Sequence, residues 1–498
     1  MKAVYLIAWL GSVVSVFGVR IGFAERDITP EIGMERPGNY FKNFHRALHD
    51  RCKVRAVVFD DGAQKVALVS VDALILRRPQ VLAARKSIQE QTGIAPGAIL
   101  IAATHSHSSG PTGMILHGEF DGAEAFVQKL AYQHSSMADA GYLKRVEGQI
   151  VDAVVAAHES LTESHVSFGS GREDGVTYNR RFRMKDGMTF TMPRQGNPNI
   201  AKPAGPIDPE VGVIAVWSDR AKTKLIGCII NFACHATTNP PGISANYVYF
   251  LEQTIRSIMG EDAVVVFLAG ASGDINCYDN RSPFRPYTGT RAGRLVGGQL
   301  GAEANKVMLH AGTTTKLNVG WRQEVLRIAR RHPQAKRVKA ARKFVESQKL
   351  SRENRTEWLF HKETVLLDHL VKVDPVRDVE VQAIQVGPAV FVTTPAEYFC
   401  QFGLDQKKAS SFPFTYPVSL ANGCVGYVPT EEAFGPNGGG YETRLTSYSN
   451  LKTNAGRLLA NTGIELINSL KPGSVPQPEG AFPFKGPWAY GSVPPEVK

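Results

Sequence analysis

The sequence has few cysteines, and none of them stands in a CxxC spacing. The six cysteines among 498 residues are Cys52, Cys228, Cys234, Cys277, Cys400 and Cys424. A metal or redox motif built on that spacing is therefore excluded. We expect small buried side chains, with one or two disulfides if the chain is exported and a pairing that the spacing does not determine.

Beyond its first 18 residues the sequence also lacks an apolar run long enough to span a bilayer. The opening stretch MKAVYLIAWLGSVVSVFG (1–18) resembles a secretory signal peptide. Lys2 precedes an apolar run, and Val16 and Gly18 fit the small residues of a cleavage site. This interpretation predicts a secreted or periplasmic protein; a genuine N-terminal strand is the alternative.

Motifs for nucleotide and nucleic-acid binding are missing as well. GASGDIN (270–276) contains glycines but not the Lys-Ser/Thr pair of a P-loop. We interpret its glycines as points where the backbone approaches a site and Asp274 as an anchor for a histidine, with a simple turn as the alternative. Much of the net charge of +11 lies in RIARRHPQAKRVKAARK (327–343). No aromatic-studded strand accompanies this stretch, so we expect no nucleic-acid partner.

The basic stretch predicts a charged helical face within a peripheral helical segment, 322–370. A solvated face needs no partner, while an anionic membrane or another subunit stays open. The tail, residues 471–498, is rich in proline and glycine. We expect it to be extended, either wrapping the body or pairing with another subunit of a homo-oligomer, or else to be disordered.

Apolar strand patterns and helical patterns alternate along the chain. The two predicted β-α-β units comprise strands 65–73 and 97–104 around a helix at 77–93, and strands 224–234 and 263–276 around a second helix. Residues 379–397 predict a hairpin that turns at Gly387-Pro388. The pattern indicates an α/β fold with mixed β-sheets flanked by helices. Its polar motifs follow the carboxyl ends of strands, where ligand sites form in open α/β sheets.

Two histidines follow the strand at 97–104, in ATHSHSSGP (103–111). His105 and His107 would share one face if that strand continued through them. His235 in NFACHATT and Glu397 in TTPAEYF follow other strands. Each residue alone is a weak signal, since a histidine after a strand is usually a hydrogen-bonded structural residue. Together they fit a catalytic zinc site, which takes three or four N/O ligands.

The motifs ATHSHSSGP, YNRRF, NFACHATT, GASGDIN, TTPAEYF and NGCVGYVPTEEAFGPNGGGYE occur in this order. The sequence resembles the neutral/alkaline (non-lysosomal) ceramidase family over residues of about 20 to 470. RIGFAERDITPEIG (20–33) is similar to the opening strand of that family. The resemblance implies a ceramidase-like catalytic domain at 19–470. The stretch after residue 470 is too short for the C-terminal immunoglobulin-like domain of ceramidases, so none is expected.

The resemblance implies one zinc ion per chain, held by His105, His235, Glu397 and Tyr427. Zinc lowers the pKa of bound water and supplies a hydroxide that attacks an amide carbonyl. His107 is implied to be the acid that protonates the leaving nitrogen.

Three further residues are carried over from the same motifs. Tyr441 matches a tyrosine that stabilises the oxyanion. Arg180 matches an arginine that contacts the polar part of the substrate, with its neighbour Arg181 as a rival for that position. Asn276 stands where ceramidases carry a substrate-contacting serine, so the substrate is less defined than the metal chemistry.

The sequence therefore predicts a zinc amidohydrolase for ceramide or another N-acyl amide, either a small molecule or lipid-like. An esterase or lactonase would need the same metal ligands and stays open. A non-catalytic binding protein that retains the fold is the third interpretation.

Overall fold

The structure of the protein is a computed structural model, and it describes residues 18–478, 480, 483 and 494–498. The predicted signal peptide lies outside the described residues except for Gly18, and residues 479, 481–482 and 484–493 of the predicted tail lie outside them too. All six cysteines are described and all are free thiols, so the expected disulfides are not formed. Within the described chain, no helix is both long and apolar enough to cross a membrane.

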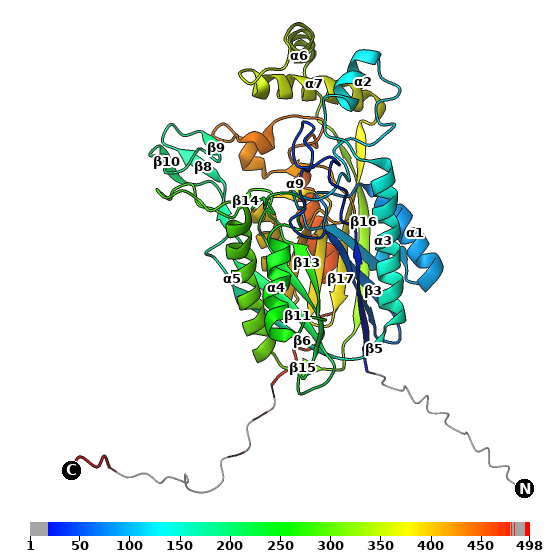
Figure 1. Cartoon of the computed structure of the whole chain (residues 1–498), viewed down its shortest axis with the longest axis vertical. Helices are drawn as coiled ribbons and strands as arrows, with labels where there is room; N and C mark the ends of the chain where they lie inside the picture. Colours follow the sequence, from blue (N-terminus) through cyan, green and yellow to red (C-terminus); the bar gives the residue numbers. More distant parts are fainter. Residues whose placement is uncertain (1–17, 479, 481–482, 484–493) are drawn as a thin grey trace, which may run out of the picture.

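A first sheet has the strand order β4-β3-β2-β1-β5. Its strands are β1 (Arg20–Asp27), β2 (Lys53–Asp60), β3 (Lys65–Val71), β4 (Ile99–Ala103) and β5 (Thr162–Glu163). The helices α1 (Arg78–Thr92) and α3 (Ala140–Glu159) cover one face of it (Figure 1). β3 and β4 are parallel neighbours joined through α1, which confirms the first predicted β-α-β unit.

A second sheet has the order β13-β12-β11-β6-β15. Its strands are β6 (His165–Arg172), β11 (Glu210–Trp217), β12 (Leu225–Phe232), β13 (Val264–Ala269) and β15 (Thr313–Thr314). The helices α4 (Tyr247–Met259) and α5 (Gly289–His310) cover its outer face (Figure 1). The parallel pairing of β12 with β13 confirms the second predicted unit.

Alternating side chains of β11 show how the second sheet is buried on both faces. Ile214 and Val216 join the core that includes the first sheet. Val213 and Ala215 point the other way and join the core formed with α4 and α5. Because successive strand residues face opposite sides, a continuous apolar run fills both cores.

A third sheet, of order β16-β17-β18-β20, packs beside the first two. Its strands are β16 (Val319–Ala329), β17 (Val376–Val386), β18 (Ala389–Thr394) and β20 (Phe414–Ser419). β17 and β18 form the predicted hairpin, and Gly387 in its turn has φ 56°, a left-handed conformation that glycine adopts without strain. The helices α8 (Cys400–Ala409) and α9 (Ala455–Asn468) share an apolar core with this sheet.

Short elements complete the described fold. The short strands are β7 (Tyr178–Asn179), β8 (Arg181–Met184), β9 (Thr189–Thr191), β10 (Ile200–Pro203), β14 (Ile275–Asn276), β19 (Glu397–Tyr398) and β21 (Tyr427–Val428). Single 3₁₀ turns occur at Pro96–Ala98, Glu431–Phe434 and Tyr441–Thr443. The helices α2 (Ala125–Tyr132), α6 (Ala335–Ser347) and α7 (Arg355–Val373) lie together at one end of the molecule (top in Figure 1).

The segment 322–370 is only partly helical, so its prediction is wrong at its start. Residues up to Ala329 belong to β16, which pairs antiparallel with β17 along its whole length. Pro333 separates this strand from α6, because proline and the residue before it disfavour a continuous helix. The rest of the segment forms the expected peripheral pair, α6 and α7. The basic stretch 327–343 is therefore split between a strand end, a loop and a helix.

Candidate metal centre and active-site cleft

The candidate ligands meet where pairs of parallel strands end. β3–β4, β12–β13 and β18–β20 are the parallel pairs of the three sheets. His105 lies two residues beyond β4, His235 three beyond β12 and Glu397 three beyond β18. The strand ends converge, and they bring these three side chains to one point.

The histidine pair does not converge through strand alternation, because β4 ends at Ala103. His105 instead has φ 64°, a left-handed conformation that is uncommon for a residue with a side chain. This turn brings the Nε2 atoms of His105 and His107 to 3.3 Å from each other. The expected proximity is present, but a turn rather than a shared strand face produces it.

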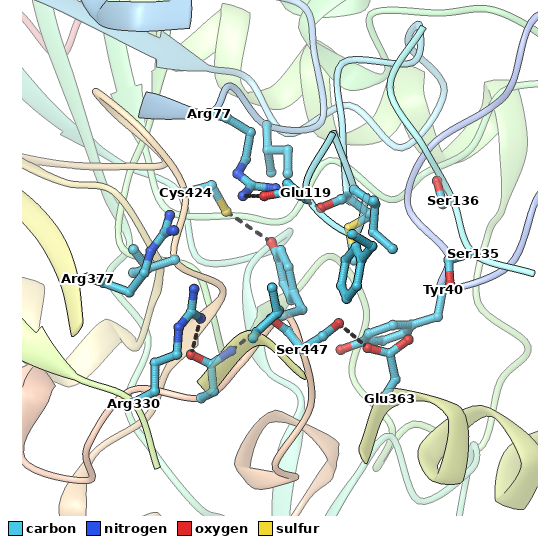
Figure 2. A pocket seen from close by; sticks show the side chains of 18 residues that line it. Tyr40, Arg77, Glu119, Ser135, Ser136, Arg330, Glu363, Arg377, Cys424 and Ser447 are labelled. Carbon is cyan, nitrogen blue, oxygen red and sulfur yellow. Dashed lines mark hydrogen bonds and ion pairs between the residues drawn. The ribbon is translucent and has the colours of Figure 1, made fainter. Parts of the chain in front are cut away.

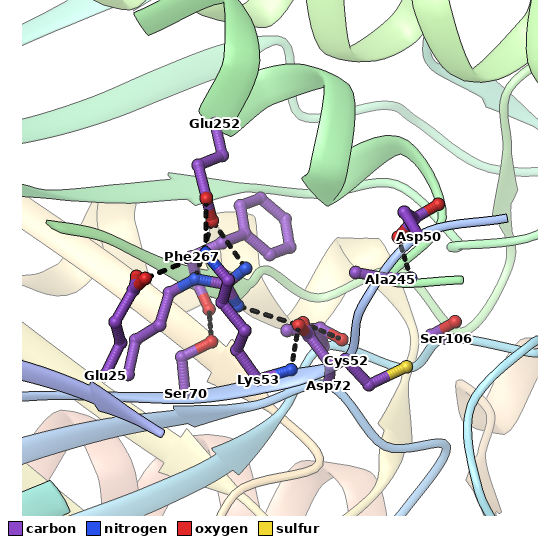
Figure 3. A network of polar contacts seen from close by, with 12 residues as sticks. Glu25, Asp50, Cys52, Lys53, Ser70, Asp72, Ser106, Ala245, Glu252 and Phe267 are labelled. Carbon is purple, nitrogen blue, oxygen red and sulfur yellow. Dashed lines mark hydrogen bonds and ion pairs between the residues drawn. The ribbon is translucent and has the colours of Figure 1, made fainter. Parts of the chain in front are cut away.

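The hydroxyl residues around the histidines hold this turn in place. The Thr104 hydroxyl donates to Asp72 Oδ1 at 3.3 Å, and the Ser106 hydroxyl donates to the Ser244 carbonyl at 2.7 Å. Figure 3 shows Asp72 within the polar network and Ser106 to its right. Arg36 donates to the His107 carbonyl at 2.9 Å. Small hydroxyl side chains are thus needed beside His105, because they form hydrogen bonds with buried polar groups around an irregular stretch of backbone.

Backbone carbonyls fix the tautomers of the two buried histidines. His105 Nδ1 lies 2.9 Å from the Leu74 carbonyl oxygen, and His235 Nδ1 lies 2.7 Å from that of Ser272. A carbonyl oxygen only accepts, so each Nδ1 carries the proton and each Nε2 of the neutral ring presents a lone pair. Burial lowers the pKa of His235 to about 4, which keeps its ring neutral at pH 7.

These lone pairs point at one another and at a carboxylate. The Nε2 atoms of His105 and His235 are 3.2 Å apart. Glu397 Oε2 lies 3.3 Å from the first and 3.1 Å from the second, and it accepts no hydrogen bond within the described chain. Burial opposes ionisation of Glu397, and a positive charge on the neighbouring imidazoles would hold its pKa well below the usual value. Electron-rich atoms this close need a cation between them, so the donor set fits a metal ion.

Glu397 is oriented by Tyr448, a residue that the sequence analysis missed. The Tyr448 hydroxyl donates to Glu397 Oε1 at 2.8 Å. Tyr448 also lines a small inner cavity of about 50 Å³ next to the cleft, and Figure 2 shows Cys424 reaching its hydroxyl there. Nothing in the motif around Tyr448 marks it, because the contact joins segments 51 residues apart.

His107 joins the same group of potential metal-binding atoms. The ligand atoms of His105, His107 and His235 all lie within 4.8 Å of one another. His107 is partly exposed to the cleft, whereas the other two rings are buried. Its role as a proton donor rather than a ligand stays a prediction.

Tyr427 and Tyr441 stand beside the carboxylate and share an arginine. Tyr427 pairs with Glu397 where β19 and β21 run parallel. Its hydroxyl lies 3.0 Å from that of Tyr441 and accepts from Arg180 at 3.1 Å. Burial raises the pKa of both phenols and outweighs the opposite effect of Arg180, so both keep their protons. Tyr441 can thus donate a hydrogen bond into the cleft.

The rivalry between Arg180 and Arg181 is resolved by where they point. The Arg180 guanidinium lies over the rings of Tyr427 and Tyr441, 5.5 and 5.2 Å from their centroids. Glu442 accepts from its Nε at 3.0 Å and holds it there. Arg181 stacks on Phe399 instead, 5.0 Å from the ring centroid. Arg180 therefore lies beside the tyrosines of the candidate site but does not itself line the cleft, so its contact with substrate stays a prediction. Glu442 is a second residue that the motifs did not indicate.

The loop GASGDIN supports the site through its backbone. A Cβ on Gly273 would lie 2.4 Å from the Glu397 carbonyl oxygen, so this glycine allows the close approach that the sequence predicted. Asp274 does not hold a histidine: its carboxylate accepts from Asn179 at 2.7 Å and from the Cys400 amide at 2.8 Å. The histidine is held by the Ser272 carbonyl of the same loop.

Gly273→Ala is expected to destabilise the protein by about 1 to 3 kcal/mol, because the added methyl group meets backbone rather than a flexible side chain. The backbone movement that makes room for the methyl group would also displace Glu397. Urea unfolding and metal content measure both effects. Gly122→Ala is the control, since a Cβ there meets nothing within 4 Å. Equal stability and metal content in the two variants would contradict the close approach of Gly273 to the backbone of Glu397.

Asn276 lies near the site but faces its own loop. Its Oδ1 accepts from the Thr237 hydroxyl at 3.2 Å and from the Cys277 amide at 2.8 Å, and its amide nitrogen contacts Met192. Its side chain is buried, and it is not part of the cleft wall. A substrate-binding role for Asn276 remains a prediction, because its side chain does not reach the cleft in this geometry.

A cleft with a volume of about 490 Å³ opens above the candidate ligands. His105, His107, Glu397, Tyr427, Tyr441 and Tyr448 form its polar part. Phe41, Met114, Leu359 and Phe360 form apolar walls, the last two from α7. A pocket of this size with few convergent polar groups is typical of small-molecule and lipid-like ligands.

The molecule is thus an α/β protein with a histidine- and carboxylate-lined cleft at the ends of its parallel strands. Its fold is shared with neutral ceramidase from Pseudomonas aeruginosa: the TM-score is 0.65 at 17% sequence identity, over 93% of this chain and 76% of that chain. A ceramidase structure complexed with C2 gives a TM-score of 0.63 at 17% identity, over 93% of this chain and 77% of that one. No protein-family profile and no curated protein matches the sequence. The predicted resemblance to the ceramidase catalytic domain is confirmed at the level of the fold.

Proposed function

We propose that the protein is a zinc-dependent amidohydrolase that cleaves an N-acyl amide bond. The observation that carries the proposal is the convergence of His105 Nε2, His235 Nε2 and Glu397 Oε2, each within 3.3 Å of the others. These atoms border a cleft with apolar walls, which suits an acyl chain. The fold shared with a neutral ceramidase supports an amide as the bond that is cleaved. The substrate class is a small or lipid-like N-acyl amide, of which ceramide is one member.

The zinc ligands in this proposal are His105, His235, Glu397 and Tyr427. They supply two nitrogen and two oxygen donors, a mixed set that suits zinc. When bound, zinc lowers the pKa of a coordinated water and polarises a carbonyl group. His107 stays outside the set because its ring is partly exposed to the cleft, where a substrate nitrogen can reach it.

The chain's own residues supply the remaining steps of hydrolysis. The oxygen of water loses a proton to His107 and bonds to the carbonyl carbon, the C–N bond breaks, and the nitrogen leaves as an amine after gaining that proton. His107 is suited to give that proton, because an amide nitrogen is a poor leaving group until it is protonated. The Tyr441 hydroxyl donates to the oxygen that becomes negative, and Arg180 keeps the two phenols in position.

Zinc content of the full chain tests the proposal most directly. We expect about one zinc per chain by elemental analysis and hydrolysis of N-acyl amides, with both lost in Glu397→Ala. Tyr448→Phe is the matched variant: it removes only the hydrogen bond to Glu397 Oε1, so we expect zinc to be retained with weakened affinity, about 10- to 100-fold. A wild-type protein that takes up no supplied zinc would contradict the proposal. A zinc-loaded protein that cleaves neither amides nor esters would instead favour a binding protein.

A further inference from the structure

The mouth of the cleft carries positive charge that the described chain does not neutralise. Arg355, the first residue of α7, lines the cleft. It makes no hydrogen bond or ion pair with a described side chain, and its guanidinium lies over the Phe41 ring, 5.0 Å from the centroid. The one carboxylate in the described cleft wall, Glu397, is committed to the histidines below.

A second arginine stacks on another aromatic residue of the cleft. Arg444 follows Tyr441 by three residues, and its guanidinium lies 3.4 Å from the ring centroid of Phe360, a cleft residue. Arg444 is exposed, and its side chain has no ion pair within the described chain. Arg337 of α6 lies close by, where it donates to the Leu445 carbonyl at 3.4 Å. Arg355 thus lines the cleft while Arg444 and Arg337 lie near its Phe360 wall, and none of the three has a carboxylate partner among the described residues.

Unpaired arginines held on aromatic rings are preorganised to bind an anion. Stacking on Phe41 and Phe360 restricts the two guanidinium groups, whose N–H groups donate to no residue in the part of the chain that the structure describes. Guanidinium donors match a carboxylate in a bidentate geometry. The overall charge of +11 adds a long-range attraction for anions.

We propose that the substrate is an anionic N-acyl amide whose carboxylate binds at Arg355, with Arg444 and Arg337 adding to the field at the mouth. This inference rests on the proposed amidohydrolase function and specifies its substrate. The acyl chain would lie against the apolar walls formed by Phe41 and Leu359, and the carboxylate would lie at the mouth. Arg355 lines the cleft itself, so the anion is part of the substrate molecule rather than of a lipid surface.

Two soluble substrates with the same acyl chain and the same N-acyl bond, one anionic and one neutral, test the proposal. We would compare kcat/KM for N-lauroylglycine and N-lauroylglycinamide with the zinc-loaded full chain, below the concentrations at which either forms micelles. We expect about a tenfold preference for the carboxylate, which corresponds to one charge-assisted contact. Arg355→Gln is expected to bring the preference close to one, and Arg355→Lys to keep part of it. Added salt is expected to weaken the preference because screening acts on exposed charges.

Arg352→Gln is the matched control, because Arg352 is an exposed arginine just before α7 that does not line the cleft. Its preference is expected to equal that of the wild type. Equal kcat/KM for both substrates, unchanged by Arg355→Gln, would overturn the anionic substrate and leave the amidohydrolase intact. A preference that arises only when anionic phosphatidylglycerol vesicles are added would overturn it in favour of a lipid surface. Failure to cleave any amide would instead remove the underlying function.

Discussion

His105→Ala and His235→Ala proteins are expected to contain no stoichiometric zinc, whereas His107→Ala is expected to keep about one zinc per chain and to lose turnover. The first two substitutions remove a buried ring whose Nε2 faces Glu397 Oε2 at 3.3 or 3.1 Å. The third removes a ring at the surface of the cleft, and loss of a general acid costs about 10²- to 10⁴-fold in rate. Elemental analysis and kcat/KM on one N-acyl amide separate the two effects.

His117→Ala serves as the control, since His117 is exposed. We expect it to match the wild type in zinc content and rate. The comparison of zinc content between His105→Ala and His107→Ala is the most informative. The ligand atoms of all three histidines lie within 4.8 Å of one another, so proximity alone does not tell which of them bind the ion. Loss of zinc from His107→Ala would make His107 a ligand and would leave the proton donor unassigned.

Sequence patterns predicted the parts of the fold that depend on local periodicity. The two β-α-β units, whose strands precede His105 and His235, were recognisable because each buried strand is a continuous apolar run bounded by polar residues. β16 was not recognised, because its conformation depends on pairing with β17, whose first residue lies 47 residues beyond the end of β16 in the sequence. A charged edge strand and a charged helix have similar compositions, so tertiary pairing decides between them.

The candidate site was predictable where a motif carries the chemistry and not where a long-range contact does. His105, His235 and Glu397 do converge, as their common position after strands indicated. Tyr448 and Glu442 act by hydrogen bonds to Glu397 and Arg180, and no spacing rule connects those positions. The φ of 64° at His105 was equally hidden, since it is imposed by the packed turn around it.

A buried ion network ties the first sheet to the second beneath this turn. Glu252 of α4 accepts from Arg55 at 2.6 Å, from Lys53 at 2.7 Å and from Arg256 at 2.6 Å. Arg55 also pairs with Asp72 at 2.8 Å, and Figure 3 shows Glu252 above Lys53 and Asp72. The side chains of Arg55, Asp72 and Glu252 are 0 to 2% exposed. The network stabilises the fold only while it is complete, since a buried charge without its partner is strongly unfavourable.

Asp72 connects the network to the turn that holds the candidate metal centre. Its other oxygen accepts from Thr104, the residue before His105. A substitution at Glu252 would therefore leave Arg55 without its main partner and loosen the position of Asp72. We expect an effect on global stability first and on the histidine turn second.

Glu252→Gln is expected to reduce the free energy of unfolding at pH 7 by about 3 to 5 kcal/mol, because it leaves three cations around a neutral amide. Burial opposes ionisation of Glu252, but Arg55, Lys53 and Arg256 outweigh it and lower its pKa from 4.5 to about 2. A lowered pKa in the folded state contributes stability that is present above pH 4.5 and is lost as the pH falls towards 2. The difference between wild type and variant should therefore shrink over that range in urea unfolding experiments.

Glu346→Gln provides the comparison for this prediction, because Glu346 pairs with Arg342 on the exposed side of α6, where both side chains are more than a third exposed. An exposed pair at this spacing contributes about 0.3 to 0.5 kcal/mol, so Glu346→Gln should unfold close to the wild-type midpoint at every pH. A Glu252→Gln protein as stable as this control at pH 7 would mean that water or relaxation compensates the buried cations. A large destabilisation that does not shrink as the pH falls towards 2 would mean that lost packing, rather than lost charge, is responsible.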